Sequence, residues 1–344
     1  MCDPKLKWEV KEMTNRKRLR CEKPYRYVFD AKAPGKLKVK LGEEFEIETE
    51  DAGSGVLKKP KDSTKIWTTD DFKYAPILLN PINGPVYIEG IERGDVVLVH
   101  ILDIIPADHG WTAKLEGFGP LAYDSRFPKI HGRNFVRPIK HLPGPSGTTS
   151  DGKAQFPRDD PSKAAIEWNL APFFGTIGLA PDHETISSLT GPYVANKGAY
   201  GGNWDARDLK KGCKLWIQSY HEGGLLFVGD LHASQGDGEW GGVANESPGL
   251  GVFKCEVLKN TRIPYARIEK EDTIIQLNNG RPLDRILHEA TVWLMQWLIN
   301  DYDFDERECY DFLATCPDFR YNVYQTVPPD HYTIGVEIAK RYLI

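Results

Sequence analysis

Short apolar runs separated by glycine, proline and aspartate dominate the chain up to about residue 260. Runs of this length, rich in β-branched and aromatic residues, are typical of strands, and Gly, Pro and Asp mark their ends. The pattern predicts strands over residues 37–40, 44–48, 86–91, 96–105, 175–180, 214–218, 225–228 and 252–258. We find neither a regular repeat nor the long alternation of strands and helices that a doubly wound sheet requires.

The C-terminal region has a helical pattern instead. Apolar residues recur there at the three- and four-residue spacing of one helix face, which predicts an amphipathic helix of about five turns. These residues are Leu283, Ile286, Leu287, Ala290, Leu294, Trp297 and Leu298. The capping-box sequence that begins at Asp305 predicts a shorter helix ending near Ala314. A final strand is expected over residues 333–336, and the apolar stripe is expected in the core or at a subunit interface.

Together these elements predict an α+β fold, mainly β, with β-sandwich or barrel-like subdomains and a C-terminal helical segment. We expect a single domain over residues 1–344. Its possible subdomains are residues 1–142 and 162–262, both β-rich, and residues 263–344, with helices and strands. Residues 143–161 are rich in Pro, Gly, Ser and Asp, which predicts a loop or linker.

Composition fits a soluble enzyme with an ample core. The chain has 344 residues, 40% of them hydrophobic, and a net charge of −5. No apolar run is long enough to span a membrane, and the first residues lack the apolar core of a signal peptide, so a cytoplasmic location is expected. The six cysteines are scattered without Cys-x-x-Cys spacing, so neither disulfides nor a structural zinc site is expected.

A basic cluster lies between Asn15 and Tyr27. It comprises Arg16, Lys17, Arg18, Arg20, Lys23 and Arg26. Such a cluster can contact nucleic acid or a membrane surface. Because the whole chain is acidic and has no known nucleic-acid module, a solvated edge or a subunit contact is the better interpretation.

The segment Gly229–Glu239 holds three carboxylates, a histidine and a glutamine within eleven residues. Side chains two apart on an extended chain share a face, which pairs Asp230 with His232 and Asp237 with Glu239. Carboxylates brought close together repel one another unless a cation or a shared proton neutralises them. Imidazole with carboxylate suits zinc, whereas an oxygen-rich set suits calcium or magnesium. The segment therefore predicts a metal site of open identity, and an ordinary Gly-Asp-Gly turn is the alternative.

The sequence pattern of this segment is Gly-Asp-x-His-Ala-x-x-Gly-Asp-Gly-Glu. It resembles the signature of the acetamidase/formamidase family. Other segments are similar to family motifs in the same order. They are residues 80–90 followed by 94–97, resembling "NPxxGPVYVEGAxPGD"; residues 175–181, resembling "GxIGVAP"; and residues 201–205, resembling "GGNxD". The likeness extends from about residue 30 onward. Trp204 departs from the aliphatic residue or Met of many members, while Glu246 matches an acidic residue that follows the central motif.

The resemblance implies metal-dependent hydrolysis of a small linear amide, such as formamide or acetamide, to a carboxylate and ammonia. A divalent metal is expected, with zinc favoured and calcium the alternative. The expected metal ligands are Asp230, His232, Glu89 and Asp205. The expected catalytic residues are Asp237, Glu239 and His232. The residues expected to contact the substrate are Asn203, His109, Trp204 and Gln235. His183 is expected near the same site. We expect a homodimer or higher homo-oligomer, and neither nucleic acid nor membrane as a partner.

Two alternatives stay open. The enzyme could cleave another linear C–N bond, such as that of a carbamate or an N-acyl amine, or the chain could be a non-catalytic β-rich binding protein stabilised by calcium. A serine or cysteine nucleophile is disfavoured. There is no Gly-x-Ser-x-Gly elbow, Ser187 and Ser188 lack flanking glycines, and Cys213 has no evident base beside it.

Overall fold

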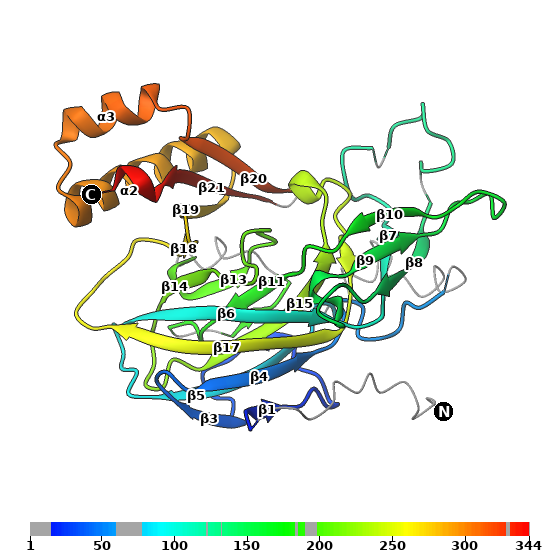
Figure 1. Cartoon of the computed structure of the whole chain (residues 1–344), viewed down its shortest axis with the longest axis horizontal. Helices are drawn as coiled ribbons and strands as arrows, with labels where there is room; N and C mark the ends of the chain where they lie inside the picture. The colour runs from blue at the N-terminus through cyan, green and yellow to red at the C-terminus, as the bar shows by residue number, and fades with distance from the viewer. Residues whose placement is uncertain are drawn as a thin grey trace.

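The computed structural model describes residues 15–59, 78–121, 123–131, 133–182, 185–189, 198–327 and 331–343. Within these residues two large β-sheets and a C-terminal pair of helices make up the fold (Figure 1). The predicted α+β fold with mainly β structure is confirmed. All eight predicted strands before residue 260 are present, with ends that differ by a few residues.

The first sheet contains nine strands among the described residues. In spatial order they are β1 (Lys17–Leu19), β4 (Glu44–Thr49), β17 (Gly249–Leu258), β6 (Val96–Pro106), β14 (Lys214–Gln218), β18 (Arg267–Glu269), β19 (Thr273–Gly280), β21 (His331–Ala339) and β20 (Arg320–Val327). Neighbours are antiparallel except for β1 and β4, which are parallel. The sheet therefore runs from the N-terminal edge to the C-terminal hairpin.

The second sheet contains ten strands among the described residues. Its main path is β10 (Ile166–Asn169), β9 (Lys153–Phe156), β8 (Phe135–Leu142), β7 (His109–Lys114), β16 (Asn245–Glu246), β15 (Leu226–Ser234), β11 (Phe173–Gly178) and β13 (Gly201–Asn203). Strand β5 (Ile82–Glu89) also pairs with β15, and β3 (Leu37–Lys40) pairs with β5. A separate small pair joins β2 (Val28–Phe29) to β12 (Ile186–Ser187). Short 3-10 helices are η2 (Thr149–Asp151), η4 (Gly198–Tyr200), η5 (Asp237–Glu239) and η6 (Lys340–Tyr342).

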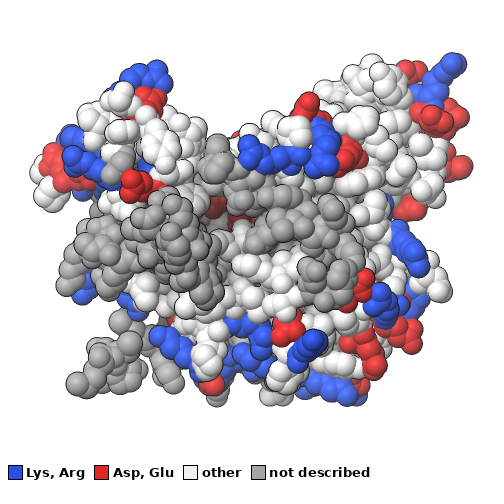
Figure 2. All heavy atoms as spheres, turned by 180° about the vertical axis from the view of Figure 1, so that it is seen from behind, with Lys and Arg blue, Asp and Glu red and all other residues white. Residues whose placement is uncertain are grey.

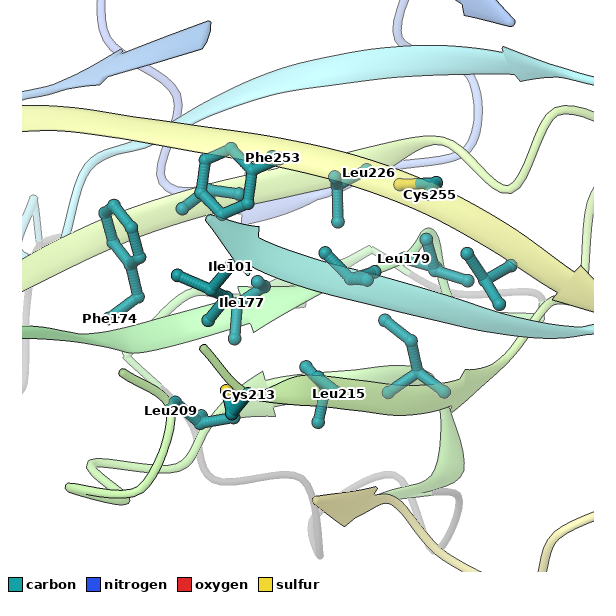
Figure 3. Packing of buried hydrophobic residues seen from close by; sticks show 14 of the residues in the cluster. Ile101, Phe174, Ile177, Leu179, Leu209, Cys213, Leu215, Leu226, Phe253 and Cys255 are labelled. Carbon is teal, nitrogen blue, oxygen red and sulfur yellow. The ribbon is translucent and has the colours of Figure 1, made fainter. Parts of the chain in front are cut away.

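The main hydrophobic core lies between the two sheets (Figure 3). Ile101 of β6 and Phe253 of β17 come from the first sheet, whereas Phe174 and Ile177 of β11 and Leu226 of β15 come from the second. Each of these side chains is fully buried. Strand β11 is buried at every position, so it is covered on both faces. This core packs against β11 and β15, and β15 carries Asp230 and His232 of the site described below.

The C-terminal helices are α2 (Leu283–Tyr302) and α3 (Glu306–Thr315), as the sequence predicts. Asp305 caps α3 by accepting from the backbone N–H of Arg307 at 2.8 Å and of Glu308 at 3.3 Å. The stripe of α2 packs in a second core against residues of β19 and β21, such as Ile274 and Val336. Core packing within the chain therefore accounts for the stripe.

Part of the segment expected as a loop or linker is a strand. Residues 153–156 of the range 143–161 form β9, which pairs with β8 and β10. Both large sheets combine strands from before residue 142 with strands from after residue 162, so residues 1–142 and 162–262 share their sheets. The reason is that β-pairing is non-local, and Pro- and Gly-rich composition predicts chain reversals without showing which strands they join.

Three of the six basic residues in the N-terminal cluster are ion-paired with β4 and the turn before it. Arg16 contacts Glu44 at 2.6 Å, Lys17 contacts Glu43 at 2.9 Å, and Arg18 contacts Glu46 at 2.6 Å. This pairing follows from the parallel register of β1 and β4. It fits a solvated sheet edge. Among the described residues, no helix has the length and apolar character needed to cross a bilayer.

Candidate functional site

Five titratable side chains come together, buried, around β15. They are Asp205, Asp230, His232, Glu239 and Glu246. His232 is at the centre. Its Nε2 lies 3.3 Å from Glu246 Oε2, 3.4 Å from Asp230 Oδ1 and 3.9 Å from Asp205 Oδ1. The cluster contains four carboxylates and one imidazole, so even a protonated His232 would leave it with excess negative charge.

Backbone conformation directs three of the carboxylates. Asp205, Asp230 and Glu239 have φ values of 46°, 56° and 41°, in the left-handed region that residues other than glycine seldom adopt. Each such conformation costs on the order of 1 kcal/mol or more and persists only where the surroundings impose it. Asp230 and His232 belong to β15, which continues to Ser234, so the predicted loop after residue 228 is strand at this point. The concentration of unfavourable backbone in one cluster is typical of a functional site.

Gly175 of β11 makes room for the cluster. A Cβ atom at this position would lie 2.5 Å from Asp205 Oδ1 and 2.7 Å from Asp230 Oδ2. The carbonyl of Gly175 also accepts from the backbone N–H groups of Trp204 and Asp205, at 2.8 and 3.2 Å. This one residue therefore holds the chain after β13 against β11 and leaves space for two carboxylates.

Gly175→Ala is expected to destabilise the protein by about 1–3 kcal/mol, because an added methyl group must displace two buried carboxylates. Urea unfolding monitored by circular dichroism measures this change. Gly236→Ala is the matched control: a Cβ there meets nothing within 4 Å, and its φ of −69° suits any residue. Equal stabilities of the two variants would contradict the steric role of Gly175.

Gln235 orients His232. Its Oε1 lies 2.9 Å from His232 Nδ1, and its Nε2 donates to the backbone carbonyls of Asp205 and Tyr324, each at 3.0 Å. Because Gln235 Nε2 is used as a donor twice, its Oε1 is the acceptor and His232 Nδ1 carries a hydrogen. Phe173 packs against the imidazole in an edge-to-face arrangement, with ring centroids 4.9 Å apart. Nε2 is thereby the atom that faces the carboxylates and is available to a proton or a cation.

Hydrogen bonds from uncharged side chains hold the carboxylates. Asn80 donates to Asp230 Oδ2 at 3.0 Å, and Thr176 Oγ1 lies 3.2 Å from the same oxygen. Gln325 of β20 donates to Asp205 Oδ2 and, at 3.1 Å, to Glu239 Oε2. Asn80 and Thr176 stand inside motifs that resemble the family, but Gln325 carries no signal in the sequence. The C-terminal hairpin therefore completes the cluster.

Burial and mutual repulsion shift the titration of the cluster. Burial raises the pKa of Asp205 well above its usual value, and the neighbouring Glu239 and Asp230 add to the effect. Burial likewise raises the pKa of Glu239 to about 7. Burial lowers the pKa of His232, but the carboxylates, Glu246 foremost, outweigh it and raise that pKa well above the usual value. The cluster therefore holds protons, or an equivalent positive charge, at neutral pH.

The donor set fits a divalent metal ion. One group of ligand atoms, from Asp205, Asp230 and His232, and another, from His232, Glu239 and Glu246, each lie within 4.8 Å of one another. Asp205 Oδ1 and Glu246 Oε2 are buried and have no hydrogen-bond partner. Buried charged oxygens without partners are costly. A cation held by the first group would satisfy Asp205 Oδ1, one held by the second group would satisfy Glu246 Oε2, and mixed carboxylate and imidazole donors are those of zinc sites.

Two predicted residues lie away from the cluster. Glu89 is at the far end of β5, about 20 Å along the strand from Ile82, which faces Gly229. Its side chain is 43% exposed and lies 3.7 Å from Lys38, so the structure does not bring it to the metal ligands. Asp237 is 79% exposed and pairs with Arg207 at 2.6 Å. The left-handed backbone of Gly238 turns Asp237 outward and Glu239 inward, so the two do not share a face.

The predicted substrate contacts have other positions. Trp204 is fully buried in the main core against Tyr265, with ring centroids 5.6 Å apart. Asn203 uses its amide within the protein, accepting from Thr176 at 2.9 Å and donating to the carbonyl of Leu189 at 3.3 Å. His109 is 38% exposed and pairs with Asp108. Of these four residues, only Gln235 lines the pocket described below. His183 lies outside the described residues.

A pocket of about 240 Å³ opens beside the cluster. Its lining includes Gln235 and Glu239, then Thr112, Ala113 and Lys114 of β7, and the aromatic side chains of Phe118 and Trp240. Figure 2 shows acidic residues at the floor of a hollow on the back face of the molecule. Glu239 is thus a buried carboxylate that belongs both to the cluster and to a pocket wall.

The comparisons with known proteins show the family of the chain. The model of the acetamidase/formamidase family matches residues 17–195 and 192–282. The chain belongs to this family. It is 27% identical over 252 residues to an acetamidase of Mycolicibacterium smegmatis, covering 60% of this chain and 59% of that protein. It is 27% identical over 246 residues to a formamidase of Methylophilus methylotrophus, covering 58% of this chain and 56% of that protein.

A solved structure extends the likeness to nearly the whole fold. The acetamidase of Yersinia enterocolitica superposes with a TM-score of 0.79 at 27% identity, covering 97% of this chain and 96% of that one. The chain spans about three fifths of the length of the curated relatives named above. The shared fold includes the sheets that position the buried cluster.

Proposed function

We propose that this member of the acetamidase/formamidase family hydrolyses a linear amide to a carboxylate and ammonia at the buried cluster. The observation that carries the proposal is the convergence of Asp205, Asp230, His232, Glu239 and Glu246. Two of their carboxylate oxygens are buried and accept no hydrogen bond. Family membership and relatives named acetamidase and formamidase support the reaction class.

A divalent ion, zinc before calcium, would be held by Asp205, Asp230 and His232. These three contribute ligand atoms within 4.8 Å of one another, and Gln235 directs the His232 Nε2 atom toward the carboxylates. The chemistry that such an ion supplies is Lewis acidity, which polarises a carbonyl and makes a water more acidic. Calcium favours six or more oxygen ligands, so the imidazole favours zinc.

Glu239 is the residue placed to move protons. It reaches the pocket as well as the cluster, and burial raises its pKa to about 7, near the pH at which a general base works best. As a carboxylate it would accept a proton from the attacking water, and as an acid it would return that proton to the departing nitrogen. Gln325, at 3.1 Å, holds one of its oxygens in place during both steps.

Ammonia release from formamide, acetamide and longer primary amides tests the proposal. We expect turnover that a chelator abolishes and zinc restores, with close to one equivalent of zinc in the purified protein by elemental analysis. Activity that survives full metal removal would contradict metal dependence and favour the protonated cluster alone. Cleavage of carbamates or N-acyl amines in place of primary amides would show that the enzyme acts on another linear C–N bond. Bound calcium without any turnover would favour a non-catalytic, calcium-stabilised binding protein.

A further inference from the structure

The pocket beside Glu239 is larger and more apolar than formamide or acetamide requires. Phe118, Leu121, Phe135 and Trp240 contribute apolar walls, and the volume is about 240 Å³. An apolar protein cavity of about 150 Å³ is sufficient to bind benzene. The pocket can therefore accept a ring with a short substituent, whereas the smallest amides would leave most of its apolar wall in contact with water.

Lys114 gives the pocket a buried cation. It stands at the end of β7 and lines the pocket, yet only 8% of its surface is exposed. Its Nζ donates to the carbonyl of Leu115, and no carboxylate lies within ion-pair distance of it among the described residues. Burial lowers the pKa of Lys114, partly offset by the more distant Glu116. A buried ammonium without an acidic partner is costly, and a bound anion would offset that cost.

The lining of the pocket therefore combines groups of different chemistry. Gln235 and Glu239 connect it to the cluster where the amide would react, and Lys114 supplies positive charge on the β7 side. A primary amide releases a nitrogen that carries only hydrogen, so any larger group must belong to the acyl part. A pocket lined by a carboxylate of the cluster, apolar side chains and a buried cation suits an acyl group with an apolar body and an anionic end.

We propose that the preferred substrates are primary amides whose acyl group has an apolar body about the size of a phenyl ring and a carboxylate that Lys114 binds. This assignment rests on the proposed amide hydrolysis and adds the substrate class. Lys114 is then a specificity-determining residue, since it contacts a group remote from the bond that breaks. Its charge selects the substrate without taking part in proton transfer.

Steady-state kinetics on matched amides test the assignment. The pairs are arylacetamides with a carboxylate on the ring, para or meta, and the same compounds with a methyl group in its place; acetamide is included. For the wild type we expect kcat/KM at least about 10-fold higher for a carboxylated compound than for its methyl counterpart. Lys114→Met should bring this ratio close to one, chiefly by raising KM for the carboxylated compound. Lys140→Met, at an exposed lysine of the adjacent β8, should preserve it.

The outcomes separate the two proposals. Turnover of acetamide without any preference for the carboxylated compounds would overturn the pocket assignment and leave amide hydrolysis standing. A Lys114→Met variant that keeps the preference, or that lowers kcat/KM equally for all three kinds of amide, would also overturn it. No turnover of any amide by the metal-loaded wild type would overturn the proposed function and the substrate assignment together.

Discussion

Glu239→Gln is expected to lower kcat/KM for amide hydrolysis by about 10²–10⁴-fold, the usual contribution of a general acid–base group. Glutamine keeps the shape and can still contact Gln325, but it can neither accept nor return a proton. Because burial raises the pKa of Glu239, the wild-type rate should fall toward acid pH as the carboxylate becomes protonated. The residual activity of the variant should lack this acid limb. Initial rates of ammonia release across pH 5–9 measure both effects.

Asp237→Asn is the matched control, two residues away in the same 3-10 helix. Its side chain is 79% exposed and paired with Arg207, so kcat/KM and metal content should stay within about 2-fold of wild type, as for most surface changes. Metal content should also change little in Glu239→Gln. If Asp237→Asn instead loses the greater part of the activity, proton transfer belongs to the outward-facing residue and the assignment to Glu239 fails.

His232→Ala should abolish both metal binding and activity, because His232 supplies a ligand atom to each of the two possible groups. It should also leave the surrounding carboxylates without their central donor, so a lower melting temperature is expected along with the loss of function. Elemental analysis after dialysis and calorimetric zinc titration measure the first effect. Wild-type zinc affinity in a folded His232→Ala protein would exclude His232 as a ligand.

A milder change keeps this test informative even if His232→Ala does not fold. Gln235→Met removes the acceptor at Nδ1 while filling similar space, and metal affinity should fall about 10–100-fold, as is usual when the partner of a histidine ligand is lost. His109→Asn is the control, since His109 is exposed and paired with Asp108. It should retain wild-type zinc content. Equal zinc affinities of Gln235→Met and His109→Asn would show that Gln235 does not position the ligand.

Much of the secondary structure follows from local sequence. The two-residue alternation and apolar runs predict the long strands of the core, and the stripe from Leu283 to Leu298 predicts α2, because burial of one face requires these periods. The cap at Asp305 is equally local. Strands such as β9 and β20 have mixed polar sequences, so only their neighbours in the sheets make them strands. Their pairing is non-local, and no short segment contains it.

The candidate site divides in a similar way. Asp230 and His232 could be found because they share one short motif and one strand. Glu89 was expected beside them as a metal ligand, but the register of β5 against β15 places it at the opposite end of its strand. Trp204 follows a conspicuous Gly-Gly-Asn turn, yet its indole faces the core. The position of Glu89 depends on strand register, and the position of Trp204 depends on the direction in which its side chain points. Neither property can be read from residue type.

The sequence by itself determined the family, the mainly β architecture, the C-terminal helices and a segment rich in ligand-type side chains, because each of these depends on composition, period or short motifs. Only the tertiary structure decided which side chains meet. It joined Glu246 and Gln325 to the His232 cluster, turned Asp237 away, and placed the buried Lys114 in the lining of a pocket that Glu239 also lines. The physical reason is that contacts between distant strands depend on register and backbone conformation.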